Sequence, residues 1–386
     1  MKRFLPYLFI IVCFGCREKY IIPFTSPPSG FLVVEGFINA GPGPTSIKLS
    51  RTIGLADSIN RKNETLAQVS VEGQDNSNTS LSETEPGLYS IAQLILDDNV
   101  QYRLHIKTKD GNDYFSSYEP VLKTPAIDSI SWERNGGVNV GVELFVNTHD
   151  PLNITKHYRW ETEETWEFHA YYFSMLQYVY DTITHKVDTV EDRPIEESNK
   201  MYYCWQHENS SRILIGSTVS LNRDSIHLPV QFIPEGSWKL GVLYSIKLNQ
   251  YAISSEEHEF LRRMKKNTEQ VGSLFDAQPS ELKGNIYNAS NPNEIVIGFV
   301  GVTTRQEKRI FISNGQVPNW NYRRYCEQIE IPVTPPDTLD AYRIYTPITI
   351  ASYHPFTGLP YTIFVADADC SICTLKGTNI KPSFWP

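Results

Sequence analysis

Residues 158–172, YRWETEETWEFHAYY, are the stretch that decides the fold of this chain. Aromatic residues occupy even positions, as at Tyr158, Trp160 and Trp166, whereas charged residues such as Arg159 and Glu161 occupy mostly odd positions. A period of two is the pattern of a β-strand, because successive side chains of a strand point to opposite faces. We therefore predict a long strand or hairpin with one aromatic face and one charged face.

The aromatic face has two interpretations, both open from the sequence. Its rings could form part of a hydrophobic core, or they could form a stacking platform for a sugar or another ring-shaped ligand. The core interpretation is favoured, because aromatic residues are enriched in strands whether or not a ligand binds. The candidate stacking residues are Tyr158, Trp160, Trp166, Phe168 and Tyr172.

The segments before this stretch also predict strands. Residues 31–38, FLVVEGFI, indicate a buried strand that ends in the Gly- and Pro-rich turn at 39–44, and residues 100–106, VQYRLHI, alternate apolar and polar side chains. Short strands with frequent turns predict an immunoglobulin-like β-sandwich over residues 31–125. A larger β-rich domain is expected over residues 126–386.

One helix is predicted inside the larger domain, near residues 254–268. Ser254 and Glu257 have the spacing of a capping box, and Phe260, Leu261 and Met264 form an apolar stripe. Further strands follow at residues 294–300, 309–312 and 361–365. The predicted class is therefore mainly β.

The N-terminus has the parts of a secretory signal. Lys2 and Arg3 precede the apolar run at residues 4–12, which is too short to cross a membrane, since a spanning helix needs about 20 residues. Gly15 and Cys16 then resemble a relaxed lipobox, so we expect a signal peptide over residues 1–15 and lipidation of Cys16. The alternative is an ordinary signal peptide with Cys16 as a bystander. Residues 16–30 contain several Pro and Ser residues and are expected to form a tether.

The remaining cysteines of the mature chain are Cys204, Cys326, Cys370 and Cys373. An even number outside the cytoplasm predicts two disulfides, although sequence alone allows three pairings. Cys370 and Cys373 could instead form a redox motif or half of a zinc site, but neither the βαβ context nor the further ligands are recognisable. Loop entropy favours bonds from this terminal pair to Cys204 and Cys326, each worth roughly 3–5 kcal/mol. Such bonds would pin the C-terminal tail to the body.

Charge and motifs exclude several functions. The chain carries a net charge of -9, and loss of Lys2 and Arg3 with the signal peptide would make it -11, which argues against a nucleic-acid partner. No nucleophile elbow, phosphate loop or dinucleotide fingerprint is present. Asp367 and Asp369 could serve acid–base chemistry or Ca²⁺, but no third ligand is recognisable, so exposed loop charges are the preferred interpretation. We predict no catalytic residue, metal site or cofactor.

The resemblance of the chain to a known family rests on several segments. They are the lipobox, residues 31–39, 160–172, Cys204 with Trp205, residues 254–266, 272–285, 294–300 and 370–385. Together they resemble the Bacteroidota lipoprotein family called domain of unknown function 4249, over nearly the whole mature chain. The ending from Cys370 to Trp385 is the most specific part. The family carries no settled activity, so the resemblance supplies no catalytic residues.

The resemblance implies a lipid-anchored binding or accessory protein of the outer membrane. Its expected partner is a TonB-dependent transporter or another outer-membrane complex, and the membrane face on which it acts stays open. The alternative is a surface protein for glycan binding or adhesion, and an all-β hydrolase is the third hypothesis. A glycan-binding protein should have an exposed shelf of Trp or Tyr rings, whereas a protein partner should leave an apolar patch elsewhere.

We predict that Cys16→Ser releases the body from the membrane, because stable anchoring would depend on the attached acyl chains. Flotation of membranes on a density gradient and labelling with palmitate measure this. A variant that still floats, together with a wild type that incorporates no palmitate, would contradict the prediction.

Overall fold

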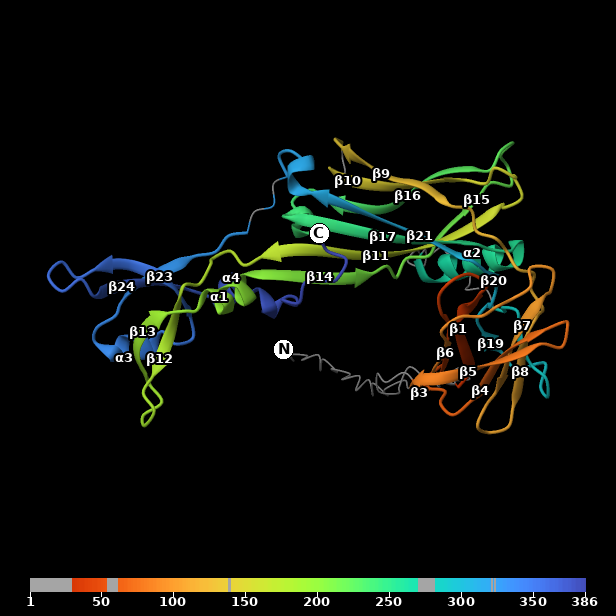
Figure 1. Ribbon diagram of the computed structural model, residues 1–386, viewed down its shortest axis with the longest axis horizontal. Helices are drawn as coiled ribbons and strands as arrows, with labels where there is room; N and C mark the ends of the chain where they lie inside the picture. The colour runs from red at the N-terminus through yellow and green to blue at the C-terminus, as the bar shows by residue number, and fades with distance from the viewer. Residues whose placement is uncertain (1–29, 54–61, 138–139, 270–281, 321, 323) are drawn as a thin grey trace, which may run out of the picture.

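The computed structural model describes residues 30–53, 62–137, 140–269, 282–320, 322 and 324–386. The predicted signal peptide, the predicted lipidation at Cys16 and all of the predicted tether except Gly30 lie outside the described residues. The described chain is mainly β, as predicted. Three units follow one another along its longest axis, which Figure 1 shows with the N-terminal unit at one end.

The N-terminal unit is a single, nearly closed sheet with the strand order β18-β8-β7-β4-β5-β6-β2-β1-β19, in which β3 pairs with β2 and β20 pairs with β1. Its strands are hydrogen-bonded along one continuous path, because β5 pairs with β4 on one side and with β6 on the other. The early strands are β1 (Leu32–Asn39), β2 (Thr45–Arg51), β3 (Lys62–Asn63), β4 (Gln68–Gly73), β5 (Asn78–Glu85), β6 (Leu88–Ile91), β7 (Tyr102–Lys107) and β8 (Asp113–Ser116).

Three strands from much later in the chain complete this sheet: β18 (Ile286–Asn288), β19 (Val296–Ile297) and β20 (Val302–Thr303). β18 pairs with β8, whereas β19 and β20 pair in parallel with β1. Their apolar side chains join the same core as Leu32, Leu49 and Leu104. The N-terminal unit is thus built from two separate stretches of chain and is not confined to the predicted residues 31–125.

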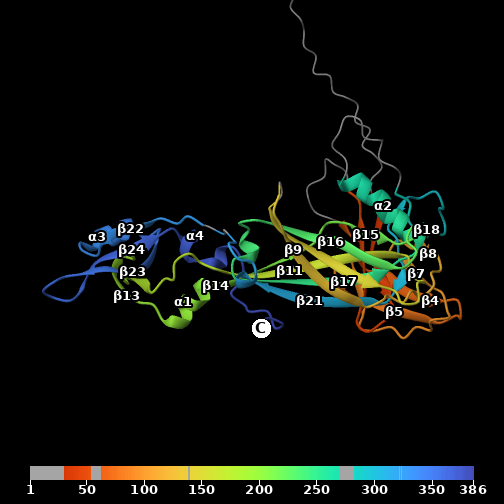
Figure 2. The same cartoon turned by 90° about the horizontal axis from the view of Figure 1, so that it is seen from above.

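The central unit is a β-sandwich with the predicted long strand at its centre. A sheet with the order β16-β10-β9 packs on a sheet with the order β14-β11-β17-β21, in which β15 also pairs with β11. Figure 2 shows the two layers from above. Their strands are β9 (Ile127–Asn135), β10 (Gly141–His149), β11 (His157–His169), β14 (Tyr203–Asn209), β15 (Leu214–Ser217), β16 (Ser225–Pro234), β17 (Leu243–Ala252) and β21 (Arg305–Ser313).

Two polar groups inside the sandwich, the Trp160 indole and the Glu164 carboxylate, have hydrogen-bond partners from neighbouring elements. The Trp160 indole N–H donates to the Gln250 side-chain oxygen at 2.8 Å. Glu164, which shares the aromatic face, is buried and accepts hydrogen bonds from Gln231, Lys239 and Tyr244 at 2.7, 3.1 and 2.7 Å. A buried carboxylate without such donors would be strongly destabilising, so this network ties together the strands that supply it.

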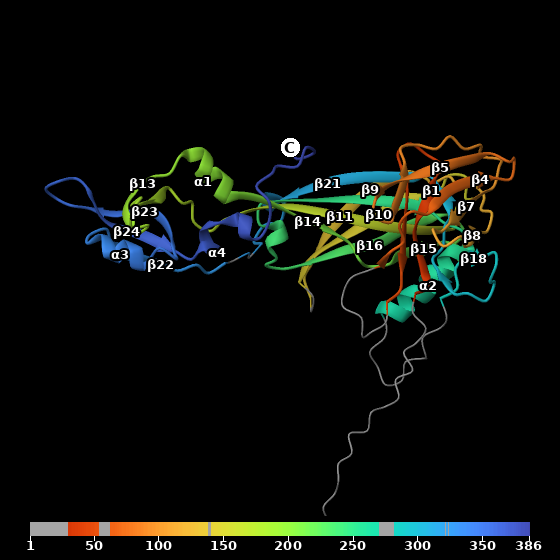
Figure 3. The same cartoon turned by 90° about the horizontal axis from the view of Figure 1, so that it is seen from below.

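The distal unit is small and has its own core around Leu339, Ile363 and Val365. It contains the hairpin β12 (Leu176–Tyr180) and β13 (Val187–Asp192), the sheet β22 (Gln328–Pro332), β24 (Pro360–Ala366) and β23 (Thr346–Tyr353), and helix α3 (Pro336–Ala341). Helices α1 (Ile195–Tyr202) and α4 (Ala368–Ser371) and the 3-10 turn η3 (Cys373–Leu375) lie where it meets the sandwich. Figures 1 and 3 place this unit at the opposite end of the molecule from the N-terminal unit.

Helix α2 (Ser255–Glu269) confirms the predicted helix to within one residue at each end. Its first turn is capped by Ser254, whose hydroxyl accepts the Glu257 backbone N–H at 3.0 Å. Phe260 is buried, while Arg262 and Lys266 are exposed and Arg263 and Lys265 are partly exposed. Among the described helices, none is both long and apolar enough to span a membrane.

The C-terminal tail lies on the outer face of the sandwich. Thr378 pairs with Trp205 at the edge of β14. Trp385 is buried, its ring packs edge-on against Phe311, and its indole N–H donates to the Glu167 carboxylate at 3.0 Å. The tail is therefore held by packing as well as by covalent bonds.

We predict that Trp385→Ala lowers the free energy of unfolding by about 3 kcal/mol, because it removes a buried indole and leaves a cavity. The matched control is Phe384→Ala, which removes a half-exposed ring stacked on Arg309 and should cost about 1 kcal/mol. Urea denaturation measures both. Equal losses of unfolding free energy for the two variants would show that Trp385 does not contribute to the core.

Candidate functional site

Two disulfides lie near the junction of the distal unit and the sandwich, and one of them joins the C-terminal segment to β14. Cys204 bonds to Cys373 and Cys326 bonds to Cys370, with Cα–Cα distances of 5.8 and 5.9 Å. The favoured pairing, in which the terminal pair bonds to two distant cysteines, is confirmed. Because all four sulfur atoms are used in these bonds, Cys370 and Cys373 form neither a redox motif nor a zinc half-site.

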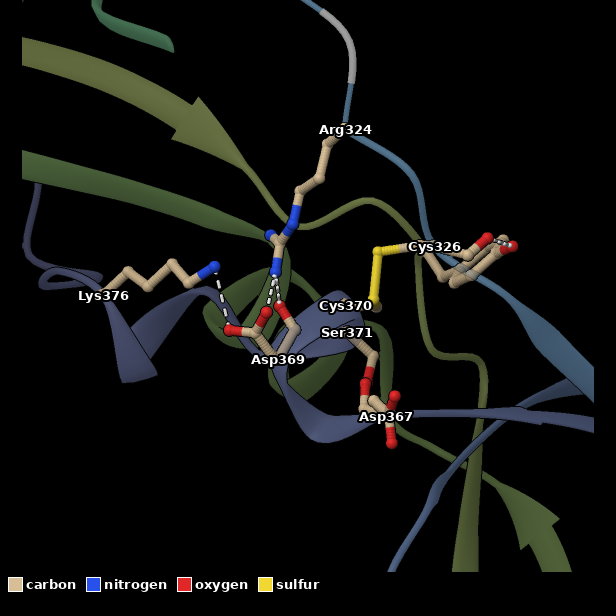
Figure 4. Close-up of a disulfide and its surroundings, with 8 residues drawn as sticks. Arg324, Cys326, Asp367, Asp369, Cys370, Ser371 and Lys376 are labelled. Carbon is tan, nitrogen blue, oxygen red and sulfur yellow. Dashed lines mark hydrogen bonds and ion pairs between the residues drawn. A yellow bond between two sulfur atoms is a disulfide. The ribbon is translucent and has the colours of Figure 1, made fainter.

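The two carboxylates beside the disulfides lie apart from each other. Figure 4 shows Asp369 between Arg324 and Lys376, whereas Asp367 points elsewhere, and its backbone carbonyl accepts the Ser371 hydroxyl. Lys376 lies 2.8 Å from Asp369, and Arg324 binds the same carboxylate. The hydrogen bond from Lys376 holds the pKa of Asp369 below its usual range; burial opposes this shift, and the hydrogen bond from Arg324 supports it. This arrangement neutralises Asp369 and forms no acid–base pair.

The rings predicted as stacking candidates lie mainly in the core. Tyr158, Trp160, Trp166 and Phe168 are buried in the sandwich. Tyr172 is half-buried, and its hydroxyl donates to the Cys326 carbonyl at 2.8 Å. The core interpretation therefore holds for the four buried rings, and the five rings form no open platform.

A different group of rings borders a small hollow beside the disulfides. Its volume is about 240 Å³, and its walls include Phe168, Trp238, Tyr171 and Tyr322. Tyr171 and Tyr322 are exposed. Neither Trp238, at the start of the short 3-10 helix η1 (Trp238–Leu240), nor Tyr322 lies in a segment with a periodic pattern, so the sequence carries no signal for them.

A cavity of about 850 Å³ lies where the N-terminal unit meets the sandwich. Four separate segments supply its walls: residues 121–128, residues 149–157, Val219 and residues 252–255. Ligand sites of proteins typically enclose about 300–1,000 Å³ and occur preferentially between domains. This cavity could not be predicted from the sequence, because no single segment supplies enough of its wall.

A buried charge pair lies at the same junction. Glu257 of α2 is buried, and burial raises its pKa to about 7, although the positive charge of Arg159 opposes the shift. The Arg159 guanidinium lies 4.5 Å from the Tyr251 ring centre and 5.8 Å from that of Phe37 in the N-terminal unit. The contact between the two units therefore includes a carboxyl group that titrates near neutral pH.

Clusters typical of an active site or metal site are not found in the described part of the chain. No group of three or more His, Cys, Asp or Glu side chains there could hold a metal ion. The rings of His157 and His258 pack against each other at an interplanar angle of 35° with their centres 4.6 Å apart, and burial lowers the pKa of both imidazoles. Among the described residues, neither imidazole is hydrogen-bonded to a nucleophile or to a carboxylate, as a catalytic triad would require.

Comparison with protein families identifies a match over most of the chain. A family model described as "Domain of unknown function (DUF4249)" matches residues 17–309, which cover the N-terminal unit and nearly all of the sandwich. No curated protein matches the chain.

We predict that Glu257→Gln makes the protein more stable than wild type at pH 8, by up to roughly 3 kcal/mol. The folded pKa of Glu257, about 7, exceeds the ordinary value of 4.5, so the folded state binds the proton more tightly than the unfolded state. The resulting stability is complete below about pH 4.5 and is lost as the pH rises through 7. The Gln variant cannot lose it, because it does not ionise.

Urea denaturation at pH 5 to 8 measures this difference. The control is Glu256→Gln, whose carboxylate is exposed and has a lowered pKa, and which should give no gain at pH 8. A wild type and a Glu257→Gln variant whose stabilities run parallel across this range would contradict the assignment.

Proposed function

This chain belongs to the family described as domain of unknown function DUF4249, and we propose that it is a Bacteroidota outer-membrane lipoprotein that works by binding another outer-membrane protein. The proposed partner is a TonB-dependent transporter or a similar complex. In this proposal the protein performs no chemistry of its own, and Cys16 carries the lipid anchor. The main support for the proposal is an exposed hairpin of the distal unit.

That feature is the distal hairpin, the turn at residues 353–361 that joins β23 to β24. Phe356 at its tip is 92% exposed, and Tyr353, Leu359 and Tyr361 are exposed as well. Large apolar side chains that gather on one exposed loop mark protein contacts, and aromatic residues often supply most of the binding energy there. The distal hairpin is therefore the proposed contact with the partner.

The position of the hairpin fits an anchored protein. In Figure 1 it lies at the end of the molecule opposite the N-terminal unit, in which Gly30, the first described residue, precedes β1. The Cys204–Cys373 disulfide ties the segment after the distal unit to β14 of the sandwich, and Cys326–Cys370 braces the distal unit itself, so the hairpin is presented on a fixed support. An anchor before Gly30 would confine the body to the membrane and raise its effective concentration near a partner.

The charge of the protein favours a partner with basic loops. The chain carries a net charge of -9, and the proposed mature form would carry -11. Opposite charge on the partner would accelerate association, and this steering falls as salt screens the charges. The apolar hairpin would then determine how long the complex lasts.

Glycan binding is the second candidate function, and the small hollow beside the disulfides favours it. The exposed rings of Tyr171 and Tyr322 border a space of about 240 Å³, together with His169 and Arg324. Aromatic faces with a few polar groups suit a sugar ring. The proposal of a protein partner ranks first, because Arg324 is already engaged by Asp369.

We predict that Phe356→Ser combined with Leu359→Ser reduces recovery of the partner at least fivefold when the lipoprotein is purified from solubilised outer membranes. The matched control is Ile95→Ser, which changes an equally exposed side chain in the N-terminal unit and should leave recovery unchanged. Mass spectrometry identifies and quantifies the partner at low and at moderate salt.

Recovery of a β-barrel protein in near-stoichiometric amount, and its decrease as salt rises, is the expected result. The proposal is wrong if the hairpin variant recovers the same proteins in the same amounts as wild type. It is also wrong if the protein has no partner and hydrolyses a glycan or peptide.

A further inference from the structure

The large cavity at the junction has an apolar interior and an apolar mouth. Leu122, Pro125 and Ile253 line it from the linker and from the turn before α2. At the mouth, Leu152, Ile154 and Val219 are 75, 74 and 64% exposed. Such a group of exposed aliphatic side chains is unfavourable in water, at about 25 cal/mol per Å² of apolar surface.

A polar scaffold holds the mouth open. The Asp150 carboxylate accepts the backbone N–H groups of Leu152, Ile154 and Thr155 at 2.9, 2.9 and 2.8 Å. Buried Asp224 accepts the Asp150 N–H at 2.7 Å and also binds Thr218, next to Val219. These bonds fix the backbone of both loops, which carry the exposed apolar side chains. The site is therefore formed before any ligand binds.

The charges around the mouth leave one cation without a counter-ion. Asp150 is used by backbone donors, and Asp128 lies 2.7 Å from His149. The Lys156 ammonium donates to the neutral side-chain oxygen of Asn153 at 2.6 Å. No carboxylate forms an ion pair with Lys156 among the described residues. A ligand with a negatively charged group would supply that missing partner.

We propose that this cavity binds one amphipathic molecule with a long apolar body and an anionic head group. The apolar body lies against Leu122, Pro125 and Ile253, passes between the apolar side chains of the mouth, and places its head group at Lys156. The cavity volume of about 850 Å³ accommodates a chain of a dozen or more carbon atoms. This inference goes beyond the proposed partner contact and does not depend on it, because the cavity and the distal hairpin lie at opposite ends of the sandwich.

Isothermal titration calorimetry with dodecanoate, below its micelle concentration, tests the proposal. The protein is the chain with Cys16→Ser, prepared without detergent so that the cavity is not filled. Saturable binding of one or two molecules of dodecanoate per chain is expected. Dodecyltrimethylammonium, which has the same tail and the opposite charge, should bind at least threefold more weakly.

Two kinds of variant locate the site. Ala126→Trp places an indole in the cavity from an exposed position of its wall and should abolish binding, and Val219→Trp at the mouth provides a second test. Lys156→Gln should weaken dodecanoate binding roughly three- to tenfold and leave dodecyltrimethylammonium unaffected. The controls Ala92→Trp and Lys109→Gln change exposed residues outside the cavity and should leave both affinities unchanged. Thermal melting confirms that each variant is folded.

Several outcomes would overturn the proposal. They are the absence of saturable binding by dodecanoate, equal affinity for the two head groups with no effect of Lys156→Gln, and binding that survives both Trp variants. Sedimentation with phosphatidylglycerol vesicles separates a soluble amphiphile from a membrane surface. Binding to vesicles without binding of dodecanoate would show that the apolar mouth contacts a bilayer and that the cavity is not a ligand site.

Discussion

The pairing of β11 is the interaction on which the rest of the structure depends. β11 pairs with β17 along one edge, and along the other edge it pairs with β15 near its start and with β14 near its end. Both edges of a 13-residue strand are thus occupied, so its register fixes the whole sheet. Its start lies at the cavity beside the N-terminal unit, and its end leads into the distal unit.

Polar groups inside the sandwich make that register specific. If the aromatic rings alone determined the pairing, β11 could shift by two residues relative to its neighbouring strands, because the same face would stay buried. Glu164 must meet Gln231, Lys239 and Tyr244, and such a shift would leave this buried carboxylate without donors. The burial of these groups is costly, and their value lies in excluding alternative pairings.

The two ends of the sandwich are joined to their neighbours by different physical means. At the distal end, two disulfides and the ion pairs of Asp369 hold the junction, which suits a unit proposed to present a contact hairpin. At the other end, the junction contains a buried carboxyl group, two histidine rings in contact and the large cavity. A loosely filled junction leaves room for a ligand, whereas a covalent junction does not.

The sequence by itself determined the mainly β class, the long strand β11, helix α2 and the four cysteines that form disulfides. It could do so because the period of apolar residues and the cap at Ser254 act locally. Only the tertiary structure decided that β18, β19 and β20 return to the N-terminal sheet, that Arg324 neutralises Asp369, and that four segments enclose one cavity. These features depend on which surfaces meet after folding. A pattern of apolar residues along one segment shows which of its faces is buried, but it does not show which other segment packs against that face.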